Sequence, residues 1–494
     1  MMGQAIARIR DVIVGQILNL LILPFIMISS LIVAVKPVAA AVLFILGAMF
    51  LYILIYPVTT LYLLIFSNTF DTLIRPSVDS IITLTKILTL ILGICLIIKV
   101  ILQKDQSSLK NVFDNPLSVA ALFFLFTQVV SIINATDYTM LIIQVIRTGS
   151  FIVLYYIIIT LVTNKKILKN VLLVLLIAFM VAAWLGIYEL ITGVNILILR
   201  WGADLQNSSL ATGTMQHRVA VSTSSNAELN EQMLRLSGVQ GGPNFLSFSM
   251  IFPSVLALYF FYLYKSWAVR ISMAFIFILF LINIIGSVSR GGVVALGIAI
   301  VIFWYFLRVR YKMLTTIAVA FAFLVLLLSI TILMPSSVYE RLSFQSDTYT
   351  VSNRIGLLKM GISMIEDHPI TGIGAGNYTT VAHRYLVPEV RRSDLIIHNC
   401  FLQAWIENGI LGFIAYITLY LFAARNIYVV LKESEDRFIN ATAVAMMATL
   451  GGYFFYANID PMLTNERYWI FFALTVVLYN LHKATRSETT PRAA

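Results

Sequence analysis

The sequence predicts an all-α, polytopic integral membrane protein, and three observations indicate that fold class. The chain of 494 residues is 60% hydrophobic and only 12% charged, with a mean hydropathy of +0.91, whereas soluble proteins carry roughly 25% charged residues. Apolar runs of about 20 residues, long enough to cross a bilayer as helices, recur along the chain. These runs do not alternate over about 10 residues as the strands of a membrane β-barrel do. Helices in lipid would satisfy the backbone polar groups of such a chain.

We expect about 12–14 transmembrane helices, because the second and third apolar runs meet at Pro57, which separates two spans or kinks one. The first run follows Arg8 and Arg10, lacks a small-residue cleavage site and is too long for the core of a signal peptide, so we interpret it as an uncleaved span. The expected spans are 12–35, 38–55, 58–68, 79–102, 116–134, 139–162, 171–192, 245–264, 269–287, 292–307, 314–334, 401–424, 438–457 and 467–482.

Basic residues on alternate loops predict the orientation, because cytoplasmic loops of membrane proteins are rich in Lys and Arg. These loops account for the formal charge of +11 without nucleic acid as a partner. Both termini are then expected in the cytoplasm. The residues concerned are Arg8, Arg10, Lys165, Lys166, Lys169, Lys265, Arg270, Arg308, Arg310, Lys312, Lys483, Arg486 and Arg492.

The opposite, extracytoplasmic side carries two long loops, at 193–244 and 335–400. They separate N-terminal spans (1–192), central spans (245–334) and C-terminal spans with a tail (401–494). Loops of this length are usually functional or disordered. The middle of the first loop, 207–231, is polar. In the second loop we expect a helix around 353–366, a Pro/Gly turn cluster, and a further helix capped by Asn399.

Several polar elements lie in or beside these loops. The second loop contains Arg354, then His368-Pro369 with Thr371-Gly372-Ile373-Gly374, the basic pair Arg391 and Arg392, and His398-Asn399 with Leu402-Gln403. Upstream stand Arg235 with Gly238 and Gly242-Pro243-Asn244-Phe245, and Ser287-Val288-Ser289-Arg290-Gly291. The glycine run Gly372–Gly376 lacks the βαβ context of a dinucleotide site, so it predicts a turn that lets the backbone approach a helix or an anion.

In this order, the elements resemble the O-antigen ligase/polymerase family of bacterial membrane glycosyltransferases, over roughly residues 180–425. The resemblance implies transfer of a glycan from an undecaprenyl-diphosphate carrier to a glycan or lipid-linked acceptor, outside the bacterial cytoplasmic (inner) membrane. It also implies chemistry without metal or cofactor, no nucleic-acid partner, and contact with membrane lipid. Further partners expected are a chain-length regulator or other polysaccharide export proteins.

The resemblance implies that Arg290 and Arg354 bind the diphosphate, that His398 acts on the acceptor hydroxyl, and that Arg235 assists. These residue types suit the chemistry, because Arg binds phosphate bidentately and His titrates near neutrality. Asn399, Arg391 and Arg392 are expected to bind substrate as well. Plainer roles remain open: an interface anchor for Arg290, an exposed loop residue for Arg354, and a polar contact at a helix start for His398. His368 and His383 are expected to be structural or exposed.

Two charged residues inside predicted spans lie in the extracytoplasmic half of the membrane. Lys86 and Arg147 lie seven and eight residues from the outer ends of their spans, or about 10–12 Å deep. Charges at that depth usually face a cavity or a partner. We interpret them as lining an outward cavity for the lipid diphosphate, with structural pairing of Arg147 to Glu189 as the alternative.

The resemblance leaves several functions open. Two long loops, each with a basic element, favour a polymerase of surface or exopolysaccharide repeat units, but an O-antigen ligase acting on lipid A-core or another terminal acceptor uses the same motifs. A transporter or flippase of lipid-linked glycans would show an internal repeat, which is not seen here. A structural or assembly membrane protein is the remaining alternative. Metal-ligand spacing is absent, and the two cysteines, Cys95 and Cys400, do not form a disulfide framework.

Overall fold

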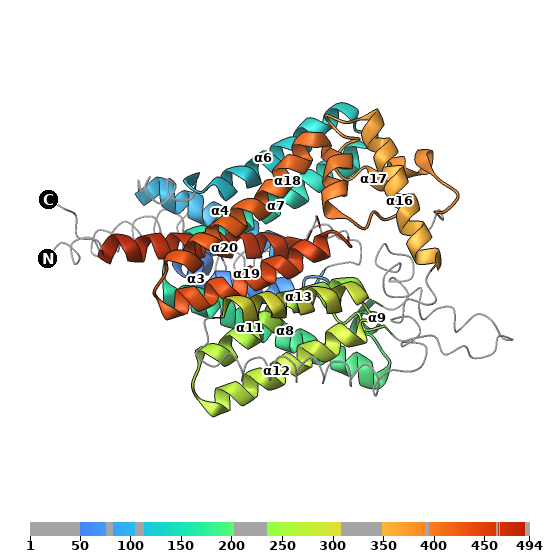
Figure 1. Cartoon of the computed structure of the whole chain (residues 1–494). Helices are drawn as coiled ribbons and strands as arrows, with labels where there is room; N and C mark the ends of the chain where they lie inside the picture. Colours follow the sequence, from blue (N-terminus) through green and yellow to red (C-terminus); the bar gives the residue numbers. More distant parts are fainter. Residues whose placement is uncertain are drawn as a thin grey trace, which may run out of the picture.

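The computed structural model of the protein describes residues 50–75, 83–103, 113–201, 235–307, 348–390, 395–460, 463 and 465–489. Regular structure in this part of the chain is entirely helical, as the sequence predicts (Figure 1). The helices are α3 (Pro57–Thr69), α4 (Leu84–Gln103), α6 (Pro116–Val130), η1 (Ser131–Asn134), α7 (Tyr138–Leu161), α8 (Lys165–Thr192), α9 (Ile196–Trp201), α11 (Pro243–Leu263), α12 (Trp267–Gly286), α13 (Arg290–Phe306), α16 (Thr348–Asp367), α17 (Tyr378–Ala382), η4 (His383–Tyr385), α18 (Cys400–Glu433), α19 (Arg437–Ala457) and α20 (Glu466–Thr489).

Within the described residues, 7 helices are long and apolar enough to cross a membrane, which makes the protein a polytopic membrane protein. They are α6 with η1, α7, α8, α11, α12, α18 and α19. The spans expected at 12–35 and 314–334, and most of the one at 38–55, lie outside the described residues.

Several helix boundaries differ from the predicted spans. Helix α8 begins at Lys165 rather than 171, because the Asn164 side chain accepts a hydrogen bond from the amide of Ile167 and caps the helix there. Helix α18 continues to Glu433 rather than 424. Helix α4 begins at Leu84 rather than 79, and the Thr83 hydroxyl accepts from the Lys86 amide at 3.4 Å. Polar side chains at these ends extend or shorten the helix beyond what the apolar run indicates.

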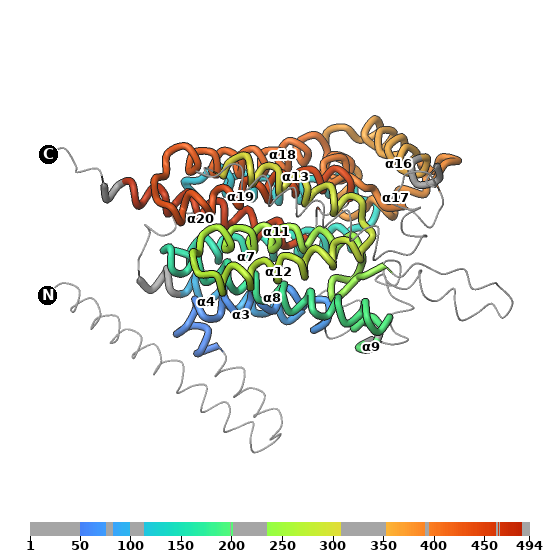
Figure 2. The backbone as a smooth tube through the Cα atoms, turned by 60° about the horizontal axis from the view of Figure 1, so that its bottom comes forward, coloured from blue at the N-terminus to red at the C-terminus, as the bar shows by residue number. Residues whose placement is uncertain are grey.

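The long helices run roughly side by side, so their ends gather at two opposite faces of the bundle (Figure 2). One face, which we call the motif end, carries α16 and α17 on the right of Figure 1. Helices α7, α11, α13, α18 and α20 begin there, and α3, α6, α8, α12 and α19 end there. The last turns of α20 lie toward the other face, the opposite end.

Small residues allow the helices behind the site to approach closely. A Cβ on Gly452 of α19 would lie 2.9 Å from the Ala295 carbonyl oxygen of α13, and one on Gly292 of α13 would lie 2.5 Å from the Ser247 Cβ of α11. Such contacts are typical of helix packing in membranes. They hold α11, α13 and α19 together at the place where their ends carry the candidate site.

Helix α18 is interrupted at Gly409, whose φ of 68° is left-handed. The turn cluster before α18 satisfies the backbone groups that this break exposes. The Ile406 and Glu407 carbonyls accept hydrogen bonds from the amides of Ile373 (2.9 Å) and Gly374 (3.1 Å), and the Ile410 amide donates to the Pro369 carbonyl at 3.0 Å. The glycine run therefore lets the backbone approach a helix, which is one of the two outcomes its sequence predicts.

The same turn cluster is fastened to the connection between α6 and α7. The Asn377 side chain accepts from the Asp137 amide at 2.6 Å and donates to the Asp137 carbonyl at 3.1 Å. The Ala375 amide donates to the Ser131 hydroxyl at 2.9 Å. The described part of the second predicted loop, 348–390 and 395–400, is thus folded and lies across the motif ends of α6, α7 and α18.

Replacing Gly409 by Ala should destabilise the protein by at least about 1–3 kcal/mol, the cost of a left-handed backbone in a non-glycine residue. A Cβ at this position would also lie 1.9 Å from the Ile370 carbonyl oxygen. We expect a lower thermal unfolding midpoint for the purified protein in detergent. Gly297→Ala is the matched control, because no atom lies within 4 Å of its added Cβ. Equal midpoints for both variants would contradict the close contact between Gly409 and the turn cluster.

Candidate functional site

His398 lies just before α18 at the motif end. Its acidic neighbour, Asp460, lies in the segment that directly follows the end of α19. The imidazole Nδ1 lies 3.4 Å from Asp460 Oδ1, at ion-pair distance but not aligned as a hydrogen bond. Asp460 is buried, whereas the His398 side chain is 27% exposed. The contact occupies the Nδ1 edge of the ring, so Nε2 lies on the opposite edge, where a substrate group could meet it.

Asp460 is itself held by its own neighbours. Its amide donates to the Tyr456 carbonyl at 3.1 Å, as the chain leaves α19, and its carbonyl accepts from the Cys400 thiol at 3.2 Å. Its Oδ2 lies 3.3 Å from the Tyr456 hydroxyl. The carboxylate therefore has a fixed position beside His398, set by the end of α19 and the start of α18.

The buried Tyr456 hydroxyl joins three segments that are far apart in the sequence. It lies 2.9 Å from the Asn244 carbonyl oxygen, 3.1 Å from the Ser247 hydroxyl and 3.4 Å from the Ser289 hydroxyl. A phenol has one proton to donate, so Asn244 and Asp460 share its donor capacity while the serine hydroxyls can donate to it. The Pro-Asn element at the start of α11, the Ser-Arg element at the start of α13 and the acid of the His398–Asp460 pair thus meet at one atom.

Arg235 ties the end of the first long loop to the same junction. Its Nε donates to the Ser287 carbonyl at 3.1 Å and one terminal nitrogen donates to Asn244 Oδ1 at 3.3 Å. The next amide, of Leu236, donates to the Gly286 carbonyl at 2.9 Å. The structure therefore brings Arg235 together with both upstream elements that the sequence singles out.

Arg290 occupies the first turn of α13, directly after a strained turn. Val288 has a φ of 50°, a left-handed conformation that is unusual for a β-branched residue. Ser289 then caps α13 by accepting from the Gly292 amide at 3.4 Å. This turn places the half-buried Arg290 at the motif end, one residue from the Tyr456 junction.

Asn399 is the N-cap of α18, as predicted: its Oδ1 accepts from the Leu402 amide at 2.9 Å. Its amide nitrogen also lies 3.5 Å from the Asn458 carbonyl oxygen. This residue therefore has a structural role that fixes the direction of the chain between His398 and α18. A role in binding substrate stays a prediction.

Arg354 lies exposed on α16, which confirms the helix expected around 353–366. A small apolar core formed by Leu357, Met360 and Met364 with Ile397 and Ile406 packs α16 against the start of α18. Gly361 permits this approach, because a Cβ there would lie 2.9 Å from Ile406 Cδ1. The helix that carries Arg354 is thus anchored beside His398, although the structure records no contact that joins the two residues.

Two polar contacts outside the bundle hold α16 on its other side. Lys359 Nζ donates to Glu389 Oε1 at 2.7 Å, which lowers the pKa of that carboxyl, and the Tyr385 hydroxyl donates to Asp367 Oδ2 at 2.5 Å. Burial, and then the contact with Asp367, raise the pKa of Tyr385 to about 12. Arg391 and Arg392 lie outside the described residues.

Lys86 and Arg147 both lie in the half of the bundle that belongs to the motif end. Arg147 is in the third turn of α7, as expected, whereas Lys86 is in the first turn of α4, nearer the helix end than the sequence predicts. Both side chains are half-buried. The acids within electrostatic reach are Asp71 and Glu466 for Lys86, and Glu407 for Arg147.

Glu189 does not act as the acid beside Arg147. Its Oε2 accepts hydrogen bonds from the backbone amides of Ser237 (3.1 Å) and Gly238 (2.7 Å), and so fixes the turn that follows Arg235. Glu407 instead provides the negative charge near Arg147, and it also accepts from the Gly376 amide at 3.0 Å. The alternative prediction that Arg147 pairs with Glu189 is therefore wrong, because the acid near Arg147 is Glu407.

Four functional candidates were missed by the sequence reasoning: Tyr456, Asp460, Glu466 and Arg467. The first two complete the junction with His398. Arg467 donates to the side chain of Gln240, and Gln240 in turn donates to the Thr69 carbonyl at 3.4 Å, so α20 is linked to α3 through the first long loop. The sequence signal was a charged or polar residue at each end of an apolar run, which interface anchoring also explains.

The described residues contain no group of three or more His, Cys, Asp or Glu side chains arranged to hold a metal ion. The fold and site together define a class: an integral membrane protein of long apolar helices, with a polar junction of His, Asp, Tyr and Arg at one end of the bundle.

Comparison with known proteins relates part of the chain to a known family. Residues 275–417 match the family model described as O-Antigen ligase. The match runs from within α12 to within α18 and includes Arg290, Arg354 and His398. The matched segment supports the resemblance to the O-antigen ligase/polymerase family of membrane glycosyltransferases that the sequence motifs indicate. A search of the curated proteins finds no match.

Asp460→Asn should reduce glycan transfer at least about tenfold, or 1.4 kcal/mol of barrier. The amide keeps the size of the side chain but removes the negative charge that faces His398. We expect normal membrane insertion, and partial activity for Asp460→Glu. Glu366→Gln, which removes an exposed acid at the same end, is the matched control. Full activity of Asp460→Asn, at equal protein abundance, would show that the carboxylate does not support His398.

Proposed function

We propose that the protein transfers a glycan from an undecaprenyl-diphosphate carrier to a sugar hydroxyl, outside the bacterial cytoplasmic membrane. The observation that carries the proposal is the junction at Tyr456, where the His398–Asp460 pair meets the Ser-Arg and Pro-Asn elements. These groups offer a base, an acid that orients it, and arginines for a diphosphate, all at one end of the bundle.

In the proposed reaction, His398 Nε2 takes the proton of the acceptor hydroxyl as that oxygen attacks the anomeric carbon of the donor. The new bond joins the acceptor oxygen to this carbon, and the bond from carbon to phosphate oxygen breaks. The lipid diphosphate leaves with the electron pair. Asp460 lies 3.4 Å from the other ring nitrogen and stabilises the imidazolium that forms.

The leaving diphosphate needs fixed positive charge, since no nucleotide or soluble carrier accompanies it. Arg290 and Arg354 are the residues proposed for this role, because Arg stays charged and binds phosphate bidentately. Arg235 holds the junction through Ser287 and Asn244 and assists from there. Asn399, Arg391 and Arg392 are proposed to contact the glycan.

Lys86 and Arg147 are proposed to guide the lipid diphosphate toward this site. They lie on α4 and α7 in the half of the bundle nearest the motif end, together with Arg75 and Arg467. Mixed charges of this kind inside a membrane bundle usually face a cavity or one another. The acids Asp71, Glu407 and Glu466 partly balance them.

The proposed orientation places the motif end outside the cell. The opposite end carries a dense set of basic side chains, as cytoplasmic faces do. Among the described residues these are Lys165, Lys166, Lys169, Lys265, Arg270, Arg425, Lys432, Arg437, Lys483 and Arg486. Polymerisation of repeat units is the preferred activity, because each long loop brings a basic element to the site. The family description favours a ligase instead.

Complementation of a strain that lacks this gene tests the reaction. We expect His398→Ala, Arg290→Ala and Arg354→Ala to lose surface glycan on gels while the proteins insert at normal levels. Arg384→Ala, which removes an exposed arginine at the same end, should keep it. Accumulated single lipid-linked units would identify a polymerase, and long lipid-linked chains a ligase. Normal glycan in all three variants would sink the proposal and favour a transporter.

Arg147→Gln and Lys86→Gln test the path of the donor separately. In membranes with titrated lipid-linked donor, we expect the apparent KM for the donor to rise about tenfold or more with kcat nearly unchanged, because these charges would act on binding alone. Arg270→Gln, a cation at the opposite end, should leave both parameters unchanged. A fall in kcat at constant KM would place Arg147 or Lys86 in the chemistry instead.

A further inference from the structure

We propose that a cavity at the opposite end of the bundle is a binding site for the headgroup of an anionic phospholipid. The cavity has a volume of about 580 Å³ and lies between the start of α6, the end of α7 and the last turns of α18 and α20. It is separate from the glycosyltransfer site, which occupies the motif end, and its function does not depend on that reaction.

The charges of this cavity select an anion. Arg425 and Lys483 line it together with one acid, Asp114, which leaves a net charge of +1. Hydrogen-bond donors from Thr163 and Asn480 complete the polar wall. Two cations and neutral donors around one space match the chemistry of a phosphodiester and a glycerol hydroxyl.

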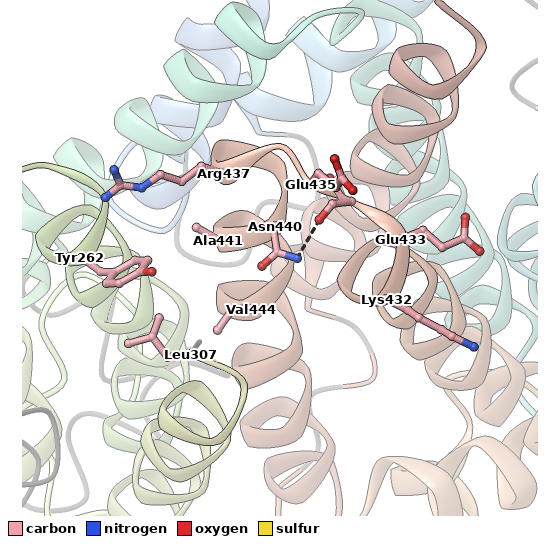
Figure 3. Close-up of a pocket in the computed structure, with 10 residues that line it drawn as sticks. Tyr262, Leu307, Lys432, Glu433, Glu435, Arg437, Asn440, Ala441 and Val444 are labelled. Atoms are coloured by element: carbon pink, nitrogen blue, oxygen red, sulfur yellow. Dashed lines mark hydrogen bonds between the residues drawn. The ribbon is translucent and has the colours of Figure 1, made fainter. Parts of the chain in front are cut away.

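A second cavity at the same end provides the contrast. It has a volume of about 400 Å³ and lies beside the connection between α18 and α19. Figure 3 shows Lys432, Glu433 and Glu435 on one side of it and Arg437 with Tyr262 on the other. Its two cations are balanced by two acids, and Arg437 already donates to the Leu263 carbonyl at 3.3 Å. Only the cavity at Arg425 therefore combines size with an excess of positive charge, among the two described here.

The level of the cavity along the bundle fits a lipid headgroup. Helix α6 begins and α7 ends beside it, whereas α18 continues from Arg425 to Glu433 and α20 from Lys483 to Thr489. At 1.5 Å per residue these extensions rise about 12 Å and about 9 Å beyond the cavity. The cavity thus lies at the depth where shorter helices stop and longer ones pass into water, which is where lipid phosphates lie.

The face that carries Arg425 indicates a lipid rather than a free anion. Leu421, Arg425 and Tyr428 lie at i, i+4 and i+7 on α18, so they share one side of the helix. Leu421 is 60% exposed and Tyr428 55%, as apolar residues that contact lipid would be. An anion bound at Arg425 would therefore have apolar protein surface directly beneath it, where acyl chains can pack.

The inner end of the cavity is built by buried polar contacts. Asn115 and Asn426 exchange side-chain hydrogen bonds at 3.3 Å and 3.2 Å, and both are almost completely buried. This pair locks α6 to α18 one residue from Arg425. The backbone that carries Arg425 is thereby held beside Asp114 and Pro116, so this wall of the cavity is part of the fold.

Titration of the purified, detergent-solubilised full chain with phosphatidylglycerol tests the site, with the thermal unfolding midpoint as the readout. We expect a saturable rise of the midpoint that phosphatidylcholine does not produce. In the double variant Arg425→Gln/Lys483→Gln, the half-saturating lipid concentration should increase at least tenfold. The double variant Arg425→Lys/Lys483→Arg should retain the wild-type value.

The control Lys166→Gln/Lys265→Gln removes two exposed cations from the same end of the bundle without touching the cavity. It should bind phosphatidylglycerol as the wild type does. An equal loss in this control would overturn the proposal in favour of a general surface-charge effect. Inorganic phosphate alone, if it reproduced the shift at millimolar concentration, would also overturn it, because the ligand would then be a soluble anion.

Discussion

The break of α18 at Gly409 is the constraint on which the motif end depends. In lipid, backbone groups that a helix break leaves unpaired cannot bond to water, so they need hydrogen-bond partners from the protein. Here the turn before α18 supplies them, with the Ile373 and Gly374 amides on one side and the Pro369 carbonyl on the other. The loop that carries the His-Pro and glycine elements is therefore fixed to the helix that begins at the His398-Asn399 element.

Beside this loop, a single buried hydroxyl connects the other elements of the candidate site. Tyr456 stands at the end of α19 and contacts groups from the starts of α11 and α13 as well as Asp460. Buried polar networks of this type are rigid when satisfied, because each unpaired member would cost free energy. The starts of α11 and α13 are distant from His398 in sequence, yet the network makes them its neighbours.

Much of this was predictable from the sequence, for physical reasons that differ by element. Composition and run length predicted the helical membrane class, the Asn399 cap predicted the start of α18, and the glycine run predicted a close backbone approach. Asp460 was not predictable, because one acid after an apolar run looks like any residue at a helix end, and its partner His398 is 62 positions away. The depth of Lys86 along its helix was overestimated. The apolar run continues through Thr83, so the sequence does not show that the helix begins only after this residue. The roles of Arg290 and Arg354 remain predictions, since the structure places them without showing what they bind.

Both cysteines of the chain are enclosed by the fold, although Cys400 follows His398 by only two positions. Its thiol points inward to the Asp460 carbonyl, and Cys95 is buried within α4. Thiol reagents and oxidants would therefore find no native cysteine exposed on the surface. A cysteine introduced at Arg384, or at Lys265 on the other face, would be the sole reactive group, so an impermeant maleimide could report directly which end of the bundle faces the outside of the cell.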